Sequence, residues 1–224
     1  MFSALDHSII KRARDAGKLE INLVDFREFS HDKHKKVDDY SFSGGAGLVL
    51  MAQPIVDCIA KTDPTHQAHR IFLTPAAPVL TQQKVVELSR KPRLILLCGH
   101  YEGVDQRAID LCCDEVLSVG DYVLTGGEIP AMVLTDAVAR HCEGVINPES
   151  LKNESFQGGG GGERPALLEH PQYTRPREFR GLTVPEVLLS GNHAEIAKWK
   201  QQASEQVTKK WRGGENLLAK RKRD

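Results

Sequence analysis

The sequence lacks a long apolar run and a paired-cysteine pattern. No stretch of its 224 residues approaches the roughly 20 consecutive apolar residues that are needed to cross a bilayer. The N-terminus has no basic region followed by an apolar one, as a secretory signal would have. The cysteines are odd in number and form no C-x-x-C pair: Cys58, Cys98, Cys112, Cys113 and Cys142. These absences argue against a membrane protein, a disulfide framework and a zinc site, and they favour a reducing cytoplasm.

Several common nucleotide-binding and catalytic motifs are absent as well. The glycines of Gly44–Gly47 do not have the spacing of a dinucleotide fingerprint, and neither G-x-x-x-x-G-K-[S/T] nor G-x-S-x-G occurs. The histidines are not at metal-ligand spacing, so no protein metal site is expected. A nicotinamide enzyme, a P-loop NTPase and a serine hydrolase are therefore poorly supported.

The chain also has no net charge, since 30 Lys and Arg residues balance 30 Asp and Glu residues. This balance conceals two opposite regions. Ile95–Glu163 contains 3 basic and 12 acidic residues, whereas His193–Asp224 contains 9 basic and 4 acidic residues. We expect the centre to favour a cationic ligand and the C-terminal region to favour a polyanion. A basic run such as Lys220–Arg223 is equally typical of a solvated chain end.

Short apolar runs alternate with helical patterns along the first part of the chain. Four runs are typical of strands: Leu19–Leu23, Ile71–Leu73, Leu94–Leu97 and Val116–Leu117. Helical spacing predicts helices over Phe2–Ala13, Gln82–Ser89 and Val104–Leu111, and over the apolar segment Ala131–His141 that Pro130 opens. Alternating strands and helices predict an α/β domain, with a parallel sheet that is covered on both faces. The segment 131–141 is apolar almost all round, so we expect it to be buried.

The composition changes after Cys142. The stretch Gly144–Pro176 is rich in Gly, Pro and polar residues and includes five consecutive glycines, Gly158–Gly162, so we expect no packed element there. Helical patterns resume from Val184 and are clearest over His193–Gln206. The predicted plan is an α/β domain over residues 1–142, a flexible linker over 143–176 and a small helical C-terminal domain over 177–224.

Loops follow three of the predicted strands directly, and the second and third of these loops contain glycines. They begin at Thr74, at Gly99 and at Ser118, and the last of them contains Gly126 and Gly127. Ligands of open α/β sheets bind outside the carboxyl ends of the strands, and glycine lets the backbone approach a ligand closely. Each loop alone is typical of an ordinary tight turn, but the three together favour one shared pocket. We expect Gly126 and Gly127 to tolerate no side chain.

These loops resemble the signatures of the bacterial tRNA (guanine-N1)-methyltransferases, the TrmD-like members of the SPOUT superfamily. The central motifs are Gly99–Asp105 and Val119–Ala131. Further matching segments extend over nearly the whole chain: Asp32–His34, Val37–Asp39, His170–Pro176 and Val184–Gly191. On these segments the chain is identified as a member of that family.

The resemblance implies a deep trefoil knot in the α/β domain, a homodimer with active sites shared between subunits, and tRNA as the substrate. It also implies that S-adenosylmethionine lies bent in the knot, with Glu102 as a candidate to face its cationic end. Mg²⁺ is an open possibility without a predicted protein site. By matching positions, the cofactor pocket is lined by Leu73, Pro75, Gly99, Tyr101, Glu102, Val119, Gly120, Tyr122, Leu124, Gly126 and Gly127.

The implied reaction moves a methyl group to N1 of the guanine on the 3′ side of the anticodon. This nitrogen must lose a proton, so a carboxylate is needed as general base, and a cation near O6 stabilises the developing charge. The family's base precedes a Ser-Phe pair, which makes Glu154 the candidate here, and Arg140 matches the arginine that faces the guanine. Without the motif, Glu154 would be taken for a solvated loop acid. We expect its linker to become ordered when tRNA binds.

Four features depart from the family pattern. The base is Glu rather than the more common Asp, His100 replaces a frequent Arg, and the pentaglycine run lengthens the linker. Relatives also begin with a strand that ends in a Phe-Pro segment. Met1 and Phe2 resemble the end of that segment, so we expect the sheet to lack its first strand.

Two alternative functions remain at this point. A knotted methyltransferase could act on another RNA or on a ribose hydroxyl, although that reaction would not need a base at Glu154. An inactive RNA-binding protein is the alternative from outside the enzymes, because a missing first strand would affect the knot.

Overall fold

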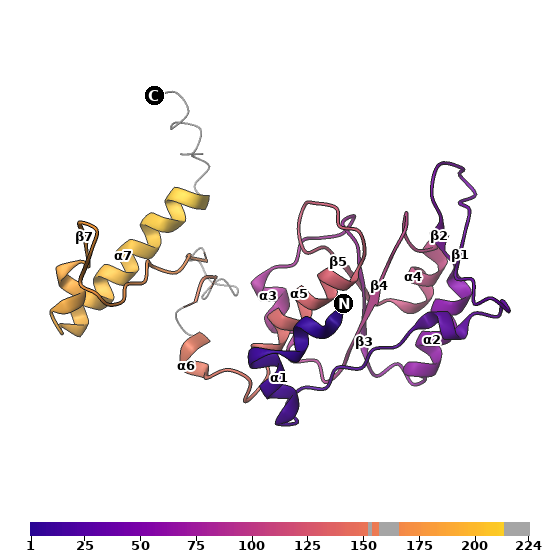
Figure 1. The fold of residues 1–224 in the computed structure, drawn as a ribbon, viewed down its shortest axis with the longest axis horizontal. Helices are drawn as coiled ribbons and strands as arrows, with labels where there is room; N and C mark the ends of the chain where they lie inside the picture. The colour runs from indigo at the N-terminus through magenta and orange to yellow at the C-terminus, as the bar shows by residue number, and fades with distance from the viewer. Residues whose placement is uncertain (152–153, 157–165, 213–224) are drawn as a thin grey trace. The chain divides into compact units, whose positions relative to one another are not determined.

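The computed structural model of the protein describes residues 1–151, 154–156 and 166–212 (Figure 1). The chain divides into two compact units, Met1–Ile146 and Asn147–Asp224. Among the helices in the described ranges, none is long and apolar enough to span a membrane.

A parallel sheet forms the centre of the first unit. β3 (His69–Leu73) lies between β4 (Leu94–Cys98) and β5 (Glu115–Leu117), and it pairs in parallel with both. The three apolar runs predicted in this part of the chain are therefore confirmed as strands. The α/β class with a parallel sheet is confirmed with them.

Helices cover both faces of this sheet (Figure 1). Phe72 packs into one apolar cluster with residues of two helices, whereas its neighbours Ile71 and Leu73 pack into a second cluster with two other helices. This alternation follows from the strand period of two. The helices of the first face are α2 (Ala52–Thr62) and α4 (Gln106–Cys112), and those of the second are α3 (Gln82–Leu88) and α5 (Glu128–Ala139).

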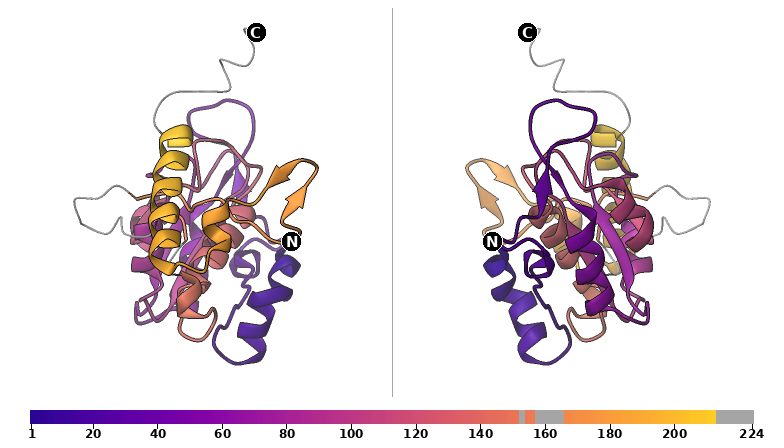
Figure 2. Two further views of the ribbon diagram at one scale, coloured as in Figure 1. Left: turned by 90° about the vertical axis from the view of Figure 1, so that its left-hand side faces the viewer. Right: turned by 90° about the vertical axis from the view of Figure 1, so that its right-hand side faces the viewer.

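The remaining elements of this unit are short. α1 (Ser8–Asp15) is followed by Gly17, where φ is +65°, and the N–H of Lys18 donates to the carbonyl of Ala13. This arrangement closes the helix as expected for glycine after the last turn. The loop between β1 and β2 projects from the unit (Figure 2). The bounds are η1 Phe2–Asp6, α1 Ser8–Asp15, η2 Phe26–Phe29, β1 Asp38–Asp39 and β2 Val49–Leu50.

Three expectations for the first unit were wrong. The helix expected over Phe2–Ala13 is interrupted at His7, whose extended backbone separates η1 from α1. The segment Leu19–Leu23 forms no strand, because no described neighbour pairs with its backbone. α5 is not buried all round, since Ile129 and Val133 are 43% and 46% exposed on one stripe of the helix.

The second unit combines a hairpin with helices. The strands β6 and β7 pair antiparallel, and the predicted C-terminal helix is confirmed and extends to Arg212. The bounds are α6 Pro148–Leu151, β6 Glu178–Phe179, β7 Leu182–Thr183, η3 Glu186–Leu189 and α7 His193–Arg212.

The expectation that nothing packs between residues 144 and 176 was wrong for its last part. The N–H of Leu168 donates to Oγ1 of Thr208 on α7 at 2.8 Å. The ring centroids of His170 and Tyr173 lie 6.1 and 6.2 Å from that of Trp199, also on α7. The apolar and aromatic side chains near residue 170 therefore gain a packing surface that only the distant helix provides.

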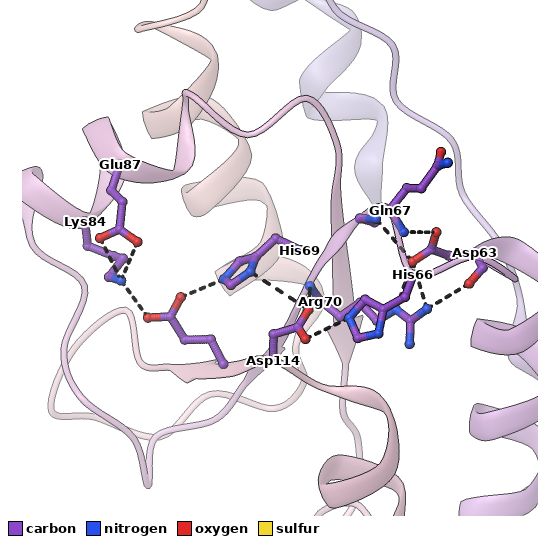
Figure 3. A network of polar contacts seen from close by, with 10 residues as sticks. Asp63, His66, Gln67, His69, Arg70, Lys84, Glu87 and Asp114 are labelled. Atoms are coloured by element: carbon purple, nitrogen blue, oxygen red, sulfur yellow. Dashed lines mark hydrogen bonds and ion pairs between the residues drawn. The ribbon is translucent and has the colours of Figure 1, made fainter.

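A polar network holds the amino ends of β3 and β5 together (Figure 3). The guanidinium of Arg70 donates to the carboxylate of Asp63 at 2.9 Å and to its carbonyl at 2.7 Å, and both side chains are almost completely buried. The N–H of Arg70 donates to Asp114, whose carboxylate also contacts Nε2 of His66 at 2.8 Å. This network lies at the end of the sheet opposite the glycine loops, so we assign it to stability.

We expect Arg70→Met to lower the Tm by about 10 °C, because the buried carboxylate of Asp63 loses its cation. Thermal unfolding followed by circular dichroism measures this change. Arg107→Met is the matched control, because Arg107 pairs with Asp105 at the surface with 72% of its side chain exposed and surface pairs contribute little. Equal Tm losses in both variants would contradict the assignment.

Acid should destabilise the protein through the same network. Burial raises the pKa values of Asp63, Asp114 and Glu115, but hydrogen bonds from their partners outweigh it, and all three pKa values are lowered. Groups with lowered folded pKa values stabilise the fold above their unfolded pKa of about 4, and this contribution is lost as the pH falls through the folded values.

We therefore expect the free energy of urea unfolding to fall steeply below pH of about 4. Asp114→Asn should flatten this dependence, whereas Asp110→Asn on the exposed side of α4 should leave it unchanged. A pH dependence that Asp114→Asn does not alter would show that this carboxylate does not contribute.

Candidate functional site

Three loops leave the carboxyl end of the parallel sheet and lie next to one another. They comprise residues 74–81 after β3, 99–105 after β4 and 118–127 after β5. Parallel strands bring these loops to a single edge, which is where α/β proteins bind their ligands.

Gly127 packs directly on the backbone of β4. Its N–H donates to the carbonyl of Gly99 at 2.8 Å. A Cβ added to Gly127 would lie 2.6 Å from Cα of Cys98 and 2.7 Å from the nitrogen of Gly99. Neither atom can move without displacing the strand, so this position excludes every side chain.

Gly126 is restricted in a different way. A Cβ at this position would meet the carboxylate of Glu128 at 2.6 Å and the imidazole of His100 at 2.8 Å. These two side chains are themselves paired, with Nε2 of His100 2.5 Å from the Glu128 carboxylate. Since both contacts are ends of side chains, a small substituent at Gly126 can be accommodated by rotation. The expectation that neither glycine tolerates a side chain therefore holds in its strict form for Gly127 alone.

The loops after β3 and β5 are joined through Ser118. Its N–H donates to the carbonyl of Pro78, and its carbonyl accepts from the N–H of Leu80 at 2.7 Å. Its hydroxyl caps the next turn by donating to the carbonyl of Gly120. Gly120 in turn faces Tyr122, because a Cβ there would lie 2.3 Å from the tyrosine ring.

The loop after β4 is held by the segment around β2. The N–H of Glu102 donates to the carbonyl of Leu48, and a Cβ on Gly47 would lie 2.6 Å from the Glu102 side chain. Tyr101 adopts a left-handed conformation with φ of +59° while its side chain is 53% exposed. Such a conformation costs about 1 kcal/mol or more in a non-glycine residue and is concentrated at functional sites.

Backbone donors are available in the loop after β5. The N–H groups of residues 123–126 donate to no other described residue. The side chains of Tyr122 and Tyr101 are more than half exposed beside these loops. Unpaired amides and exposed aromatic faces suit a ligand with hydrogen-bond acceptors and a flat ring.

The thiol at the end of β4 is not a nucleophile at neutral pH. Burial, and after it the nearby carboxylate of Glu128, raises the pKa of Cys98 to about 12. A thiol in this state reacts poorly, because the thiolate is the reactive form.

The structure brings together all eleven positions that the resemblance assigns to the cofactor pocket. Leu73 is the last residue of β3, and the other ten lie in these loops: Pro75, Gly99, Tyr101, Glu102, Val119, Gly120, Tyr122, Leu124, Gly126 and Gly127. Sequence reasoning did not find the roles of Ser118 and Glu128. The available signals were a serine before V-G-D and an acid after G-G. Neither residue indicates a role by itself, because the contacts of Ser118 with residues 78 and 80 and of Glu128 with His100 exist only in the folded chain.

Arg140 is not part of this loop cluster within one chain. It caps the far end of α5, whereas Gly127 caps the start, and 12 helical residues separate them. They are therefore 13 steps apart, which at 1.5 Å per residue is about 20 Å. A guanidinium cannot bridge that distance from its own backbone.

Glu154 belongs to the second unit, where its neighbours are held by hydrogen bonds. The N–H of Phe156 donates to the carbonyl of Leu167, and the hydroxyl of Ser155 accepts from the N–H of Glu169 at 2.9 Å. Part of the expected flexible linker, including the five glycines, falls on residues 152–153 and 157–165, which lie outside the described residues.

These features define an α/β protein whose ligand loops converge at the carboxyl edge of a parallel sheet. A family model described as tRNA (Guanine-1)-methyltransferase TrmD matches residues 1–219. The chain therefore belongs to this family.

Curated relatives cover most of the chain. It is 49% identical over 214 residues to the tRNA (guanine-N(1)-)-methyltransferase of Clostridioides difficile, which covers 94% of this chain and 90% of that protein. It is 50% identical over 205 residues to the protein of the same name from Caldanaerobacter subterraneus (91% and 82% covered) and 51% identical over 205 residues to that from Ruminiclostridium cellulolyticum (90% and 85% covered).

Proposed function

We propose that the protein transfers a methyl group from S-adenosylmethionine to N1 of the guanine on the 3′ side of the tRNA anticodon. The observation that carries this proposal is the match to the family over residues 1–219, together with the glycine loops that the family motif places at the sheet edge. A tRNA substrate and five free cysteines support a cytoplasmic site of action.

The residues of the loop cluster fit this cofactor. Unpaired amides of residues 123–126 offer donors for the adenine and carboxylate acceptors, and Tyr101 and Tyr122 offer ring faces. The acidic balance of the central region favours a sulfonium cation. When bound, S-adenosylmethionine supplies the methyl group. The protein's part is to orient the two reactants for in-line transfer, which is a large source of rate. The described residues contain no cluster of three or more possible metal ligands.

The crossing of two loops supports the trefoil knot that the family implies. β3 is the central strand, yet the loop after β5 passes its carboxyl end to place Gly127 on β4. The loop after β3 runs the opposite way to pair with Ser118 beyond β5. Connections at one edge of a sheet rarely cross, so this crossing supports a knotted arrangement.

Two observations support a homodimer with shared sites. Arg140 lies about 20 Å from the loops of its own chain along α5, so a second subunit would have to supply it. Ile129 and Val133 form an exposed apolar stripe on the same helix, and a subunit interface would cover it. In this arrangement Glu154 takes the N1 proton, and Arg140 stabilises the negative charge at O6.

The decisive experiment is incubation of the protein with unmodified tRNA and S-adenosylmethionine, followed by mass analysis of the nuclease digest. We expect 1-methylguanosine, and no product when adenine replaces the guanine beside the anticodon. Methylation of a ribose hydroxyl or of another base would identify a different knotted methyltransferase. Binding of tRNA without any methylation would identify an RNA-binding protein.

A further inference from the structure

Both residues that follow Glu154 are tied to one neighbouring segment of the second unit. The N–H of Phe156 donates to the carbonyl of Leu167 at 2.8 Å, and the N–H of Glu169 donates to the hydroxyl of Ser155 at 2.9 Å. The segment 167–169 therefore holds residues 154–156, which we call the base turn, directly beside the candidate base.

Thr208 on α7 holds the other side of this segment. Its Oγ1 accepts from the N–H of Leu168 at 2.8 Å and donates to the carbonyl of Ser204, one turn earlier in the helix, at 2.7 Å. The hydrogen bonds of the segment thus alternate in direction, as they do along an extended strand. Leu168 is bonded to α7, and its two neighbours in the chain are bonded to the base turn. The second hydrogen bond of the Thr208 hydroxyl fixes its orientation.

Arg212 lies one helical turn beyond Thr208 and contacts the base turn itself. Residues four positions apart share one face of a helix, and the guanidinium carbon of Arg212 lies 5.2 Å from the ring centroid of Phe156. Phe156 has a left-handed backbone with φ of +69°. A non-glycine residue keeps such a conformation only where its surroundings determine it. Here the surroundings include the carbonyl of Leu167 and the cation of Arg212.

The charge of Arg212 would by itself indicate a different role. The last turn of α7 carries Lys209, Lys210 and Arg212, and basic residues of nucleic-acid-binding proteins commonly contact phosphates. A phosphate contact contributes to affinity, whereas the ring contact of Arg212 acts on the turn that carries Glu154. The two roles therefore predict losses in different constants: the affinity for tRNA in the first case, and the rate at saturation in the second.

We propose that Thr208 and Arg212 are positioning residues for methyl transfer, because they hold the base turn and thereby the carboxylate of Glu154. This inference rests on the proposed role of Glu154 as general base. A base acts only within hydrogen-bond distance of the proton that it takes, and a misplacement of about 1 Å can cost about 100-fold in rate. The helix that is expected to bind tRNA is then also the element that places the base.

The test is single-turnover methylation at saturating tRNA and S-adenosylmethionine. Thr208→Val keeps the shape of the side chain but removes the acceptor, so we expect it to lower the rate about tenfold or more, whereas Thr208→Ser should keep the rate. Arg212→Ala should lower the rate similarly, and Arg212→Lys should restore most of it, because a lysine also binds an aromatic face. Lys209→Ala is the charge-matched control. Lys209 is exposed on the same turn of α7, and its variant should retain the parental rate at saturation.

A double variant separates positioning from a general loss of structure. If Thr208 acts only through Glu154, adding Thr208→Val to Glu154→Gln should slow the reaction no further. Two losses that multiply in the double variant would contradict the proposal.

Hydrogen exchange gives a measurement that does not depend on activity. In Thr208→Val the amides of Phe156, Leu168 and Glu169 should exchange about tenfold faster than in the parent protein, whereas those of β3 should not change. Unchanged exchange would overturn the proposed hydrogen-bond path. Faster exchange with a parental methylation rate would show that these contacts do not position the base.

The remaining outcomes separate this inference from the proposed function. A weaker affinity for tRNA in Arg212→Ala, with a parental rate at saturation, would overturn the positioning role of Arg212 and make it a phosphate contact. A slow Glu154→Gln beside fully active Thr208→Val and Arg212→Ala would overturn this inference alone. A fully active Glu154→Gln would overturn the assignment of the base, and this inference with it.

Discussion

Gly127→Val is expected to weaken S-adenosylmethionine binding by about 100-fold or more, because over-packing against a rigid backbone costs about 3 kcal/mol. A Cβ at this position would lie 2.6 Å from Cα of Cys98. The start of α5 would have to leave β4, and the loop of residues 118–127 would move with it. Isothermal titration calorimetry with the cofactor measures the change.

Gly126→Ala is the matched control for this prediction. Its added Cβ meets the ends of the His100 and Glu128 side chains rather than backbone, so we expect less than about tenfold loss of affinity. Binding of tRNA should survive in both variants. Loss of tRNA binding together with cofactor binding in Gly127→Val would indicate misfolding instead of a blocked site.

The second large effect is expected at Glu154. Glu154→Gln keeps the size of the side chain but cannot accept the N1 proton, and general-base catalysis contributes about 10²–10⁴-fold in rate. We expect this loss in single-turnover methylation of tRNA, with the affinity for S-adenosylmethionine unchanged. Glu143→Gln, an exposed acid in the same predicted linker, should retain the parental rate. A Glu154→Gln variant that methylates at the parental rate would remove Glu154 from the mechanism.

The two inactive variants together test whether the sites are shared. If one subunit supplies the glycine loops and the other supplies Glu154 and Arg140, a mixed dimer of Gly127→Val and Glu154→Gln contains one complete site. Random exchange makes about half of the dimers mixed, so about a quarter of the parental activity should return. Two variants that stay inactive after verified subunit exchange would place both groups in a site formed by a single chain.

The local sequence pattern was sufficient to predict the central strands and the loops that follow them. The runs at Ile71–Leu73 and Leu94–Leu97 are continuously apolar, and Pro75 and Gly99 come two residues after their ends, so chain-local information predicts both the strands and the ligand loops. The family motifs then assigned eleven positions to one pocket, and the parallel sheet brings those positions to one edge.

Other features depended on partners far away in the chain. Leu19–Leu23 has the alternation of a strand, but a strand exists only when a neighbour accepts its hydrogen bonds, and no described residue does so here. The segment near residue 170 has a loop-like composition, yet it packs because Trp199 on α7 lies against it.

The difference between Gly126 and Gly127 also depends on residues that are far away in the chain. The sequence alone determined the α/β class, the order of the central elements and the family, because these follow from periodicity and from motifs that are contiguous in the chain. The tertiary structure decided which glycine lies on backbone and which on movable side chains, and it separated Arg140 from the loops of its own chain. Those properties are distances between residues far apart in sequence, and only packing sets them.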